Sequence, residues 1–182
     1  MLAARRGTPT VILLMGVSGS GKSTTGRNLS RLLGWPFSDA DDFHPPENIR
    51  KMKSGRPLDD SDREPWLAAI ASYIDERRRA GKPAIVSCSA LKRRYRQALI
   101  AGKPDVALVF LSGTKAIIGE RLSRRKGHFM PPSLLDSQFA ALETPEPDEG
   151  PLVVSIALSP RRVVETITQG LGLGSALQNR AR

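Results

Sequence analysis

One stretch, residues 15–23, constrains the fold of this 182-residue chain more than any other. It reads Met-Gly-Val-Ser-Gly-Ser-Gly-Lys-Ser and fits the pattern G-x-x-x-x-G-K-[ST] of a phosphate-binding loop. The apolar run 11–14 before it is typical of a buried parallel strand, and residues 22–33 after it have the apolar spacing of a helix. Strand, loop and helix together favour a phosphate site over a Gly/Ser-rich turn that merely joins two elements.

The chemistry of such a loop follows from its backbone. Glycines let consecutive N–H groups turn inward toward phosphate oxygens, and the helix that follows adds the positive end of its dipole. We expect Lys22 to reach the β- and γ-phosphates and the Ser23 hydroxyl to ligate Mg²⁺. The residues expected to hold the nucleotide here are Gly16, Val17, Ser18, Gly19, Ser20, Gly21, Lys22, Ser23 and Thr24.

Charge and cysteine content narrow the class of protein. Lys and Arg number 28 against 18 Asp and Glu, a formal charge of +10, which fits nucleic acid, an anionic membrane or small anionic substrates. The single cysteine, Cys88, excludes an internal disulfide and agrees with a reducing compartment.

Arg5 and Arg6 before the apolar residues 11–17 superficially resemble a signal peptide, but the run is short and ends inside the loop. We therefore expect a soluble cytoplasmic protein with no membrane span.

Apolar runs and helix signals alternate along the chain. Strands are expected over residues 11–14, 35–38, 84–88, 106–111 and 152–157, and helices over 22–33, 47–53, 63–80, 92–101, 114–125, 133–142 and 160–170. Ser61 or Asp62 is expected to cap the third helix, and residues 144–151 to form an exposed polar linker. The alternation predicts one α/β domain, with a five-stranded parallel sheet covered by helices on both faces.

Two carboxylates, Asp39 and Asp41, fall where the predicted second strand ends. Sheets of this kind bind ligands at that edge, and we expect the second strand beside the first. One carboxylate can then support Mg²⁺ while the other accepts a proton from an attacking hydroxyl. An Asp-rich turn that caps the next helix is the alternative that spacing alone leaves open.

Two groups of basic residues follow. The first consists of His44, Arg50, Lys51, Arg56 and Arg63. Arginine suits an anionic or polyhydroxy ligand, because its planar fork can bind a carboxylate through two hydrogen bonds, although most such charges are simply solvated. The second lies at 121–128, where Arg121 and Arg125 share a helix face and could close over phosphates. A basic helix end that satisfies its own carbonyl groups explains these residues equally well.

Further motifs are more particular than the phosphate loop. In chain order they are Gly16-Val-Ser-Gly-Ser-Gly-Lys-Ser23, Asp39-x-Asp41 with His44-Pro45, Asn48-Ile-Arg-Lys-Met52, Gly55-x-Pro57-Leu58-x-Asp60, Asp62-Arg63-x-Pro65-Trp66-Leu67, Cys88-Ser-Ala-Leu-Lys92 with Tyr95-Arg96, Arg125-Lys-Gly-His-Phe129, and Gln138-Phe139 with Leu142-Glu143. From about residue 11 to residue 167 the chain resembles the gluconate kinases of the thermoresistant-gluconokinase type, relatives of shikimate and nucleoside-monophosphate kinases.

The resemblance implies a fold and a reaction. The fold is the P-loop kinase three-layer sandwich, with a core of about 10–171, an acceptor-binding region of about 39–66 and a small lid of about 121–135. The reaction is phosphorylation of D-gluconate at its 6-hydroxyl by ATP with Mg²⁺, giving 6-phosphogluconate and ADP for sugar-acid catabolism. The family is usually cytoplasmic and often dimeric.

The resemblance also assigns roles to single residues. Asp41 would accept the hydroxyl proton, and Asp39 would help Ser23 to hold Mg²⁺. Arg50 and Arg63 would bind the sugar acid, with His44 and Lys92 as further candidates. Arg121 would lie near adenine, and Arg124 or Arg125 in the lid would meet the phosphates, Arg125 together with Lys22 and Asp41 forming the expected catalytic set. Asp42 departs from the pattern by adding a third acid beside the pair.

Two alternatives remain at this stage. A shikimate-type or nucleotide-type kinase would need different acceptor residues, and the segments at 44–45 and 88–92 speak against it. A nucleic-acid-binding ATPase would explain the positive charge and the basic runs 77–79 and 92–94. However, only 5% of residues are aromatic, which leaves little to stack on bases, so we expect no nucleic-acid partner.

Overall fold

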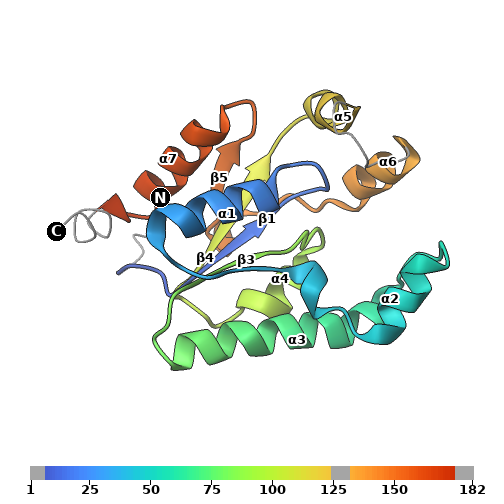
Figure 1. Ribbon diagram of the computed structural model, residues 1–182, viewed down its shortest axis with the longest axis horizontal. Coiled ribbons are helices and arrows are strands. Elements are labelled where there is room, and N and C mark those ends of the chain that lie inside the picture. Colours follow the sequence, from blue (N-terminus) through green and yellow to red (C-terminus); the bar gives the residue numbers. More distant parts are fainter. Residues whose placement is uncertain (1–6, 124–131, 175–182) are drawn as a thin grey trace.

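The computed structural model describes residues 7–123 and 132–174. Five parallel strands form a sheet in the order β2-β3-β1-β4-β5 (Figure 1). The strands are β1 Val11–Met15, β2 Phe37–Asp39, β3 Ala84–Ser87, β4 Val106–Ser112 and β5 Leu152–Ser155. The predicted parallel five-stranded sheet is confirmed. Its central strands can be buried on both faces because β1 is wholly apolar and β3 and β4 are apolar up to a final serine.

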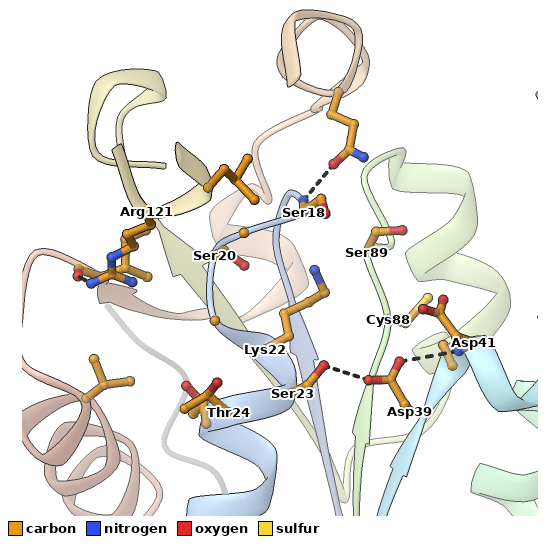
Figure 2. A pocket seen from close by; sticks show the side chains of 18 of the residues that line it. Ser18, Ser20, Lys22, Ser23, Thr24, Asp39, Asp41, Cys88, Ser89 and Arg121 are labelled. Atoms are coloured by element: carbon orange, nitrogen blue, oxygen red, sulfur yellow. Dashed lines mark hydrogen bonds between the residues drawn. The ribbon is translucent and has the colours of Figure 1, made fainter. Parts of the chain in front are cut away.

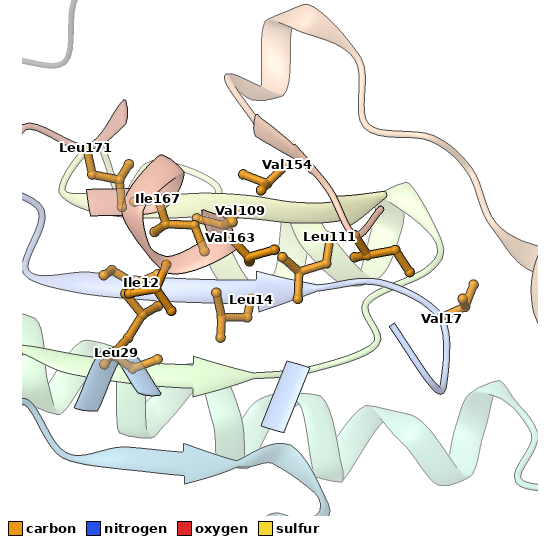
Figure 3. Close-up of a cluster of buried hydrophobic side chains, with 14 of the residues drawn as sticks. Ile12, Leu14, Val17, Leu29, Val109, Leu111, Val154, Val163, Ile167 and Leu171 are labelled. Carbon is orange, nitrogen blue, oxygen red and sulfur yellow. The ribbon is translucent and has the colours of Figure 1, made fainter. Parts of the chain in front are cut away.

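Helices cover both faces of this sheet (Figure 1). They are α1 Lys22–Leu33, α2 Pro46–Lys53, α3 Asp60–Arg79, α4 Arg93–Ile100, α5 Lys115–Ser123, α6 Pro132–Ala141 and α7 Pro160–Gly170, with short 3₁₀ turns η1 Ala40–Phe43 and η2 Pro147–Glu149. Alternate side chains of β1 enter different cores. Ile12 and Leu14 pack with residues of α1, α5 and α7 (Figure 3), whereas Leu13 and Met15 pack with residues of α3 and α4. The result is the three-layer arrangement expected from the sequence.

The order of the strands corrects one expectation. Strand β2 does not lie beside β1, because β3 is inserted between them and pairs with both. The reason is visible in the residues: β3 is buried throughout, whereas β2 is three residues long, half-buried and ends in Asp39, as suits an edge strand. Since β1 lies between β3 and β4, the crevice where ligands bind in such sheets opens at the end of β1.

Helix α3 begins three residues before the expected start, and its cap is Asp59 rather than Ser61 or Asp62. The Asp62 backbone N–H donates to Asp59 Oδ1 at 3.0 Å, and the Asp59 N–H donates to Asp62 Oδ2 at 2.8 Å. This reciprocal capping box places Ser61 and Asp62 inside the first turn. The early start places Asp60 in the first turn of α3, a helix that packs against η1.

The segment 144–151 is largely exposed, as expected, but ion pairs attach it to the body of the protein. Arg96 of α4, whose side chain is fully buried, donates to the Glu149 carboxylate at 2.6 and 2.8 Å and to the Glu143 carbonyl oxygen at 2.9 Å. Arg93 binds the exposed Glu146 and Asp148 of the same segment. The segment is therefore fastened to α4 by ion pairs. Across residues 7–123 and 132–174, no helix is both long and apolar enough to cross a bilayer.

Candidate active site

The phosphate-binding loop joins β1 to α1 at the crevice, as its sequence predicts (Figure 2). Gly16 has a φ of 147°, and a Cβ there would lie 2.8 Å from Ser20 Oγ and 2.9 Å from the Leu111 carbonyl oxygen, so this position requires glycine. Gly21 caps α1 with a φ of 91° and without a side-chain hydrogen bond to the first turn. The helix N-terminus is thus open toward the cavity, where an anion can accept from its backbone N–H groups.

Lys22 turns back over this loop. Its ammonium group donates to the carbonyl oxygens of Gly16 at 2.9 Å and Val17 at 3.0 Å. Burial lowers the pKa of Lys22, and the neighbouring Cys88, Asp39 and Asp41 oppose that shift. The two carbonyl groups keep a desolvated cation at the position from which it can meet phosphate oxygens.

Ser23 and Asp39 connect α1 to the end of β2 across the crevice. The Ser23 hydroxyl donates to Asp39 Oδ2 at 2.7 Å, and Asp39 Oδ1 accepts from the Asp41 backbone N–H at 3.3 Å (Figure 2). A hydroxyl and a carboxylate are oxygen ligands that suit Mg²⁺, whose other ligands are usually waters and substrate phosphates. In the described part of the chain no group of three or more His, Cys, Asp and Glu could by itself hold a metal ion. This donor set therefore fits a cation that arrives with a phosphate.

Asp41 opens into the same cavity as the loop. The cavity has a volume of about 600 Å³, and its lining includes Lys22, Ser23, Asp39 and Asp41 but not Asp42. Desolvation raises the pKa of Asp41, the Asp39 carboxylate adds to the rise, and His44 and Lys22 oppose it. A carboxylate with a raised pKa beside a phosphate site has the properties of a general base.

An aromatic stack supports the turn that carries Asp41. His44 stacks on Trp66 of α3 with ring centroids 4.6 Å apart and planes 10° apart, and the Trp66 indole N–H donates to the Ala40 carbonyl oxygen at 2.7 Å. The buried Asn48 donates to the Asp62 carbonyl oxygen at 2.7 Å. Trp66 also lines the cavity, a role that was not predicted from its place in the segment Asp62-Arg63-x-Pro65-Trp66-Leu67. An indole N–H that holds η1 gives no periodic signal in a sequence.

Two further candidates for binding the acceptor, Arg63 and Lys92, lie around Asp60 of α3. Arg63 is 3.7 Å and Lys92 is 3.5 Å from its carboxylate, which Arg94 and the Tyr95 hydroxyl also contact. The hydrogen bond from Tyr95, the largest cause, and that from Arg94 lower the pKa of Asp60 to about 2, and the charge of Lys92 adds to the shift. Arg50 lies apart, paired with Glu47 at 2.9 Å and with 69% of its side chain exposed. Among described residues, the cavity lining includes none of His44, Arg50, Arg63 and Lys92.

The opposite end of the cavity is more apolar. Arg121 of α5 donates to the carbonyl oxygen of Ile156, and the lining there continues with Leu122, Leu158, Pro160 and Val163. A planar guanidinium beside aliphatic side chains suits the face of a nucleotide base. Gln138 of α6 reaches the loop and accepts from the Ser18 N–H at 2.6 Å, a contact that no sequence pattern announced. Arg124, Arg125 and most of the expected lid at 121–135 lie outside the described residues.

The turn after β3 forms the floor between the loop and the acids. Burial raises the pKa of the Cys88 thiol to about 12, so this residue is a small neutral group, as expected. The Ser89 carbonyl oxygen accepts from the Gly16 N–H at 3.3 Å. Ala90 has a φ of 44°, and Arg96 donates to its carbonyl oxygen at 3.2 Å. The buried guanidinium thus holds a strained turn at the cavity wall.

A parallel sheet with a phosphate loop at its switch point and a carboxylate across the crevice, Asp41, defines a phosphoryl-transfer enzyme of the P-loop class. A family model described as an AAA domain matches residues 11–145. A gluconokinase of Gluconobacter oxydans is 44% identical over 159 residues, covering 87% of this chain and 89% of that protein.

Solved structures agree with this match. A gluconokinase from Sinorhizobium meliloti, 44% identical, superposes with a TM-score of 0.82 over 97% of this chain and 100% of its own. A sugar kinase from a Janibacter species, also 44% identical, superposes with a TM-score of 0.83 over 93% of this chain and 98% of its own. The chain belongs to the gluconokinase family.

Proposed function

We propose that this protein transfers the γ-phosphoryl group of ATP to the 6-hydroxyl of D-gluconate, giving 6-phospho-D-gluconate and ADP. The observation that carries the proposal is that Asp41, with its raised pKa, opens into the cavity that also holds the phosphate loop and Lys22. Relatives named gluconokinase that match nearly the whole chain support gluconate as the acceptor. The reaction would serve the catabolism of sugar acids.

Each residue then has a defined task. The N–H groups of the loop and Lys22 bind the β- and γ-phosphates, and Arg121 lies beside the adenine ring of the nucleotide. Asp41 takes the proton of the gluconate 6-hydroxyl while the hydroxyl oxygen attacks the γ-phosphorus. The bond between that phosphorus and the oxygen that bridges it to the β-phosphate then breaks, and ADP leaves. Ser23 and Asp39 would hold Mg²⁺, which supplies charge neutralisation on the phosphates when bound.

The sugar acid would lie between Asp41 and the cationic residues near α3. Arg63 and Lys92 share one carboxylate, Asp60, and their charges exceed its single negative charge, which leaves capacity for the carboxylate of gluconate. Desolvation lowers the pKa of His44, the Asp41 carboxylate opposes this shift, and the Arg63 charge adds to it, so His44 interacts electrostatically with both residues. Arg50 would need to leave Glu47 to take part. Arg124 and Arg125 remain predicted lid contacts to the phosphates.

Four broader expectations are also proposals: the compartment, the domain organisation, the oligomeric state and the lack of a nucleic-acid partner. We place the enzyme in the cytoplasm, as a single domain spanning residues 1–182 that assembles as a homodimer. Its positive charge is assigned to small anionic ligands, because both ATP and gluconate are anions, and no nucleic acid is needed to explain it.

A coupled ADP-release assay tests the function directly. The purified chain, with Mg²⁺ and ATP, should turn over D-gluconate and leave shikimate, other aldonates and nucleoside monophosphates largely unreacted. Turnover of shikimate or of a nucleoside monophosphate in preference to gluconate would overturn the choice of acceptor. Binding of ATP with no turnover of any of these acceptors would refute the proposed reaction while leaving the nucleotide site intact.

A further inference from the structure

Gln138 makes a contact that the proposed mechanism does not use. It lies on α6, 120 residues along the chain from the phosphate loop, yet its side-chain oxygen Oε1 accepts from the Ser18 N–H at 2.6 Å. Figure 2 shows this bond as the dashed line that rises from Ser18. Gln138 also lines the cavity that contains Lys22 and Asp41. The contact therefore places an amide, which has both donor and acceptor atoms, at the cavity that contains Lys22 and Asp41.

The position of the Ser18 N–H identifies the part of the nucleotide that it faces. It follows directly after Gly16 and Val17, whose carbonyl oxygens hold the Lys22 ammonium at 2.9 and 3.0 Å. In a loop of this kind the lysine meets the β- and γ-phosphates and the backbone N–H groups donate to phosphate oxygens. The Ser18 N–H and the Lys22 ammonium thus lie at the end of the cradle that receives the terminal phosphate, and Gln138 Oε1 occupies an acceptor position there.

From this juxtaposition we infer that Gln138 recognises the transferable phosphate of the donor, an inference that rests on the proposed kinase function. When a nucleoside triphosphate binds, a terminal phosphate oxygen replaces Oε1 at the Ser18 N–H. The Gln138 amide then turns so that Nε2 donates to an oxygen of the γ-phosphate. After transfer the diphosphate offers no such oxygen, and Oε1 returns to Ser18. Gln138 accordingly distinguishes triphosphate from diphosphate.

The surroundings of Gln138 suit this role. The next residue, Phe139, packs against the core that contains α1 and α7, and helix α6 packs on α5. The backbone of α6 is thereby held on the body of the protein, while the side chain needs only rotation of its terminal amide to exchange acceptor for donor. An amide is suited to both states, whereas a carboxylate could only accept and would repel a phosphate.

Binding measurements on the full-length chain test this inference without any acceptor present. With Mg²⁺ in excess, calorimetric titrations with a non-hydrolysable ATP analogue and with ADP give the ratio of the two dissociation constants. Gln138→Glu should weaken binding of the triphosphate analogue by about tenfold or more and that of ADP much less, since one hydrogen bond to a charged group is lost and a repulsion added. Gln97→Glu, on the exposed surface of α4, makes the same chemical change away from the site and should leave the ratio unaltered.

A second variant separates recognition from simple blocking. Gln138→Asn keeps the amide but shortens the side chain, so it should also weaken triphosphate binding selectively, by a smaller factor. An unchanged ratio of the two dissociation constants would overturn the inference, because it would show that Gln138 only supports the loop. Tighter binding of the triphosphate analogue by either variant would also overturn it, because it would show that Gln138 blocks the loop. These readouts do not involve gluconate, so failure of the proposed acceptor would be seen separately in the ADP-release assay.

Discussion

The buried pair of Arg96 and Glu149 should contribute more to stability than any exposed ion pair of this protein. The Arg96 side chain is fully buried and that of Glu149 is 7% exposed, and two hydrogen bonds of 2.6 and 2.8 Å join them. Glu149→Ala would leave a guanidinium without its counter-ion in the protein interior. Removal of one partner of such a pair costs about 3–5 kcal/mol, a large fraction of the roughly 5–15 kcal/mol that stabilises a typical domain.

The assay is urea denaturation followed by circular dichroism, with the free energy of unfolding obtained by linear extrapolation. Glu165→Ala is the matched control, because Glu165 pairs on the surface with Arg161, whose side chain is 89% exposed, and its loss should have little effect. Glu149→Gln should fall between the two, since it keeps one oxygen that can accept from Arg96 but loses the charge and replaces the second acceptor by an NH₂ donor. If Glu149→Ala and Glu165→Ala lower stability equally, the reasoning from burial is refuted.

The pH dependence gives an independent measurement on the same pair. Burial alone would raise the pKa of Glu149, but hydrogen bonds from Arg96 and the Glu146 N–H outweigh it, so its pKa is lowered. A lowered pKa contributes stability that is present above the ordinary pKa of glutamate and is lost as the pH falls through the folded-state value. The stability difference between the unmodified protein and Glu149→Gln should therefore shrink on acidification.

Three further predictions concern the site and its support. Asp41→Asn should lower the turnover number roughly 10²–10⁴-fold and abolish the fall in kcat/KM as the pH drops through the raised pKa of Asp41, and near-normal turnover would exclude it as the base. Arg63→Ala should raise the KM for gluconate about tenfold while changing that for ATP little, and more than Arg50→Ala does; the reverse ranking would move the acceptor site toward α2. Gly26→Ala should destabilise the fold by about 1–3 kcal/mol in thermal or urea unfolding, because its Cβ would lie 2.2 Å from the Phe37 ring; an unchanged midpoint would show that the ring moves away freely.

Local pattern was sufficient for much of the fold. The apolar runs of β1, β3 and β4 and the glycine and lysine spacing of the loop each carry their own structural signal, because burial on both faces and phosphate binding demand those residue types. Asp39 and Asp41 were placed correctly at a strand end, and Ser23 meets Asp39 directly. Their roles remain predictions until the variants are measured.

Long-range contacts escaped prediction, for physical reasons. The insertion of β3 between β1 and β2 depends on which edge each strand can tolerate, and a three-residue strand carries little information about that. The Gln138–Ser18 bond and the Arg96–Glu149 pair join residues 120 and 53 positions apart, and neither amide nor charge repeats with any period. Asp59 was overlooked as a cap because acidic residues crowd its neighbourhood and composition alone does not say which one begins the helix.

The intervening strand β3 fixes how far apart donor and acceptor can be. Neighbouring strands lie about 4.8 Å apart, so the tips of β1 and β2 are separated by two such steps, or roughly 9–10 Å. That gap accommodates a phosphoryl group as it passes between two oxygens. The small side chain of Cys88 lines the cavity at the bottom of this gap. A larger residue at position 88 would therefore narrow the space between Lys22 and Asp41, both of which interact with Cys88, and would hinder transfer without removing either group.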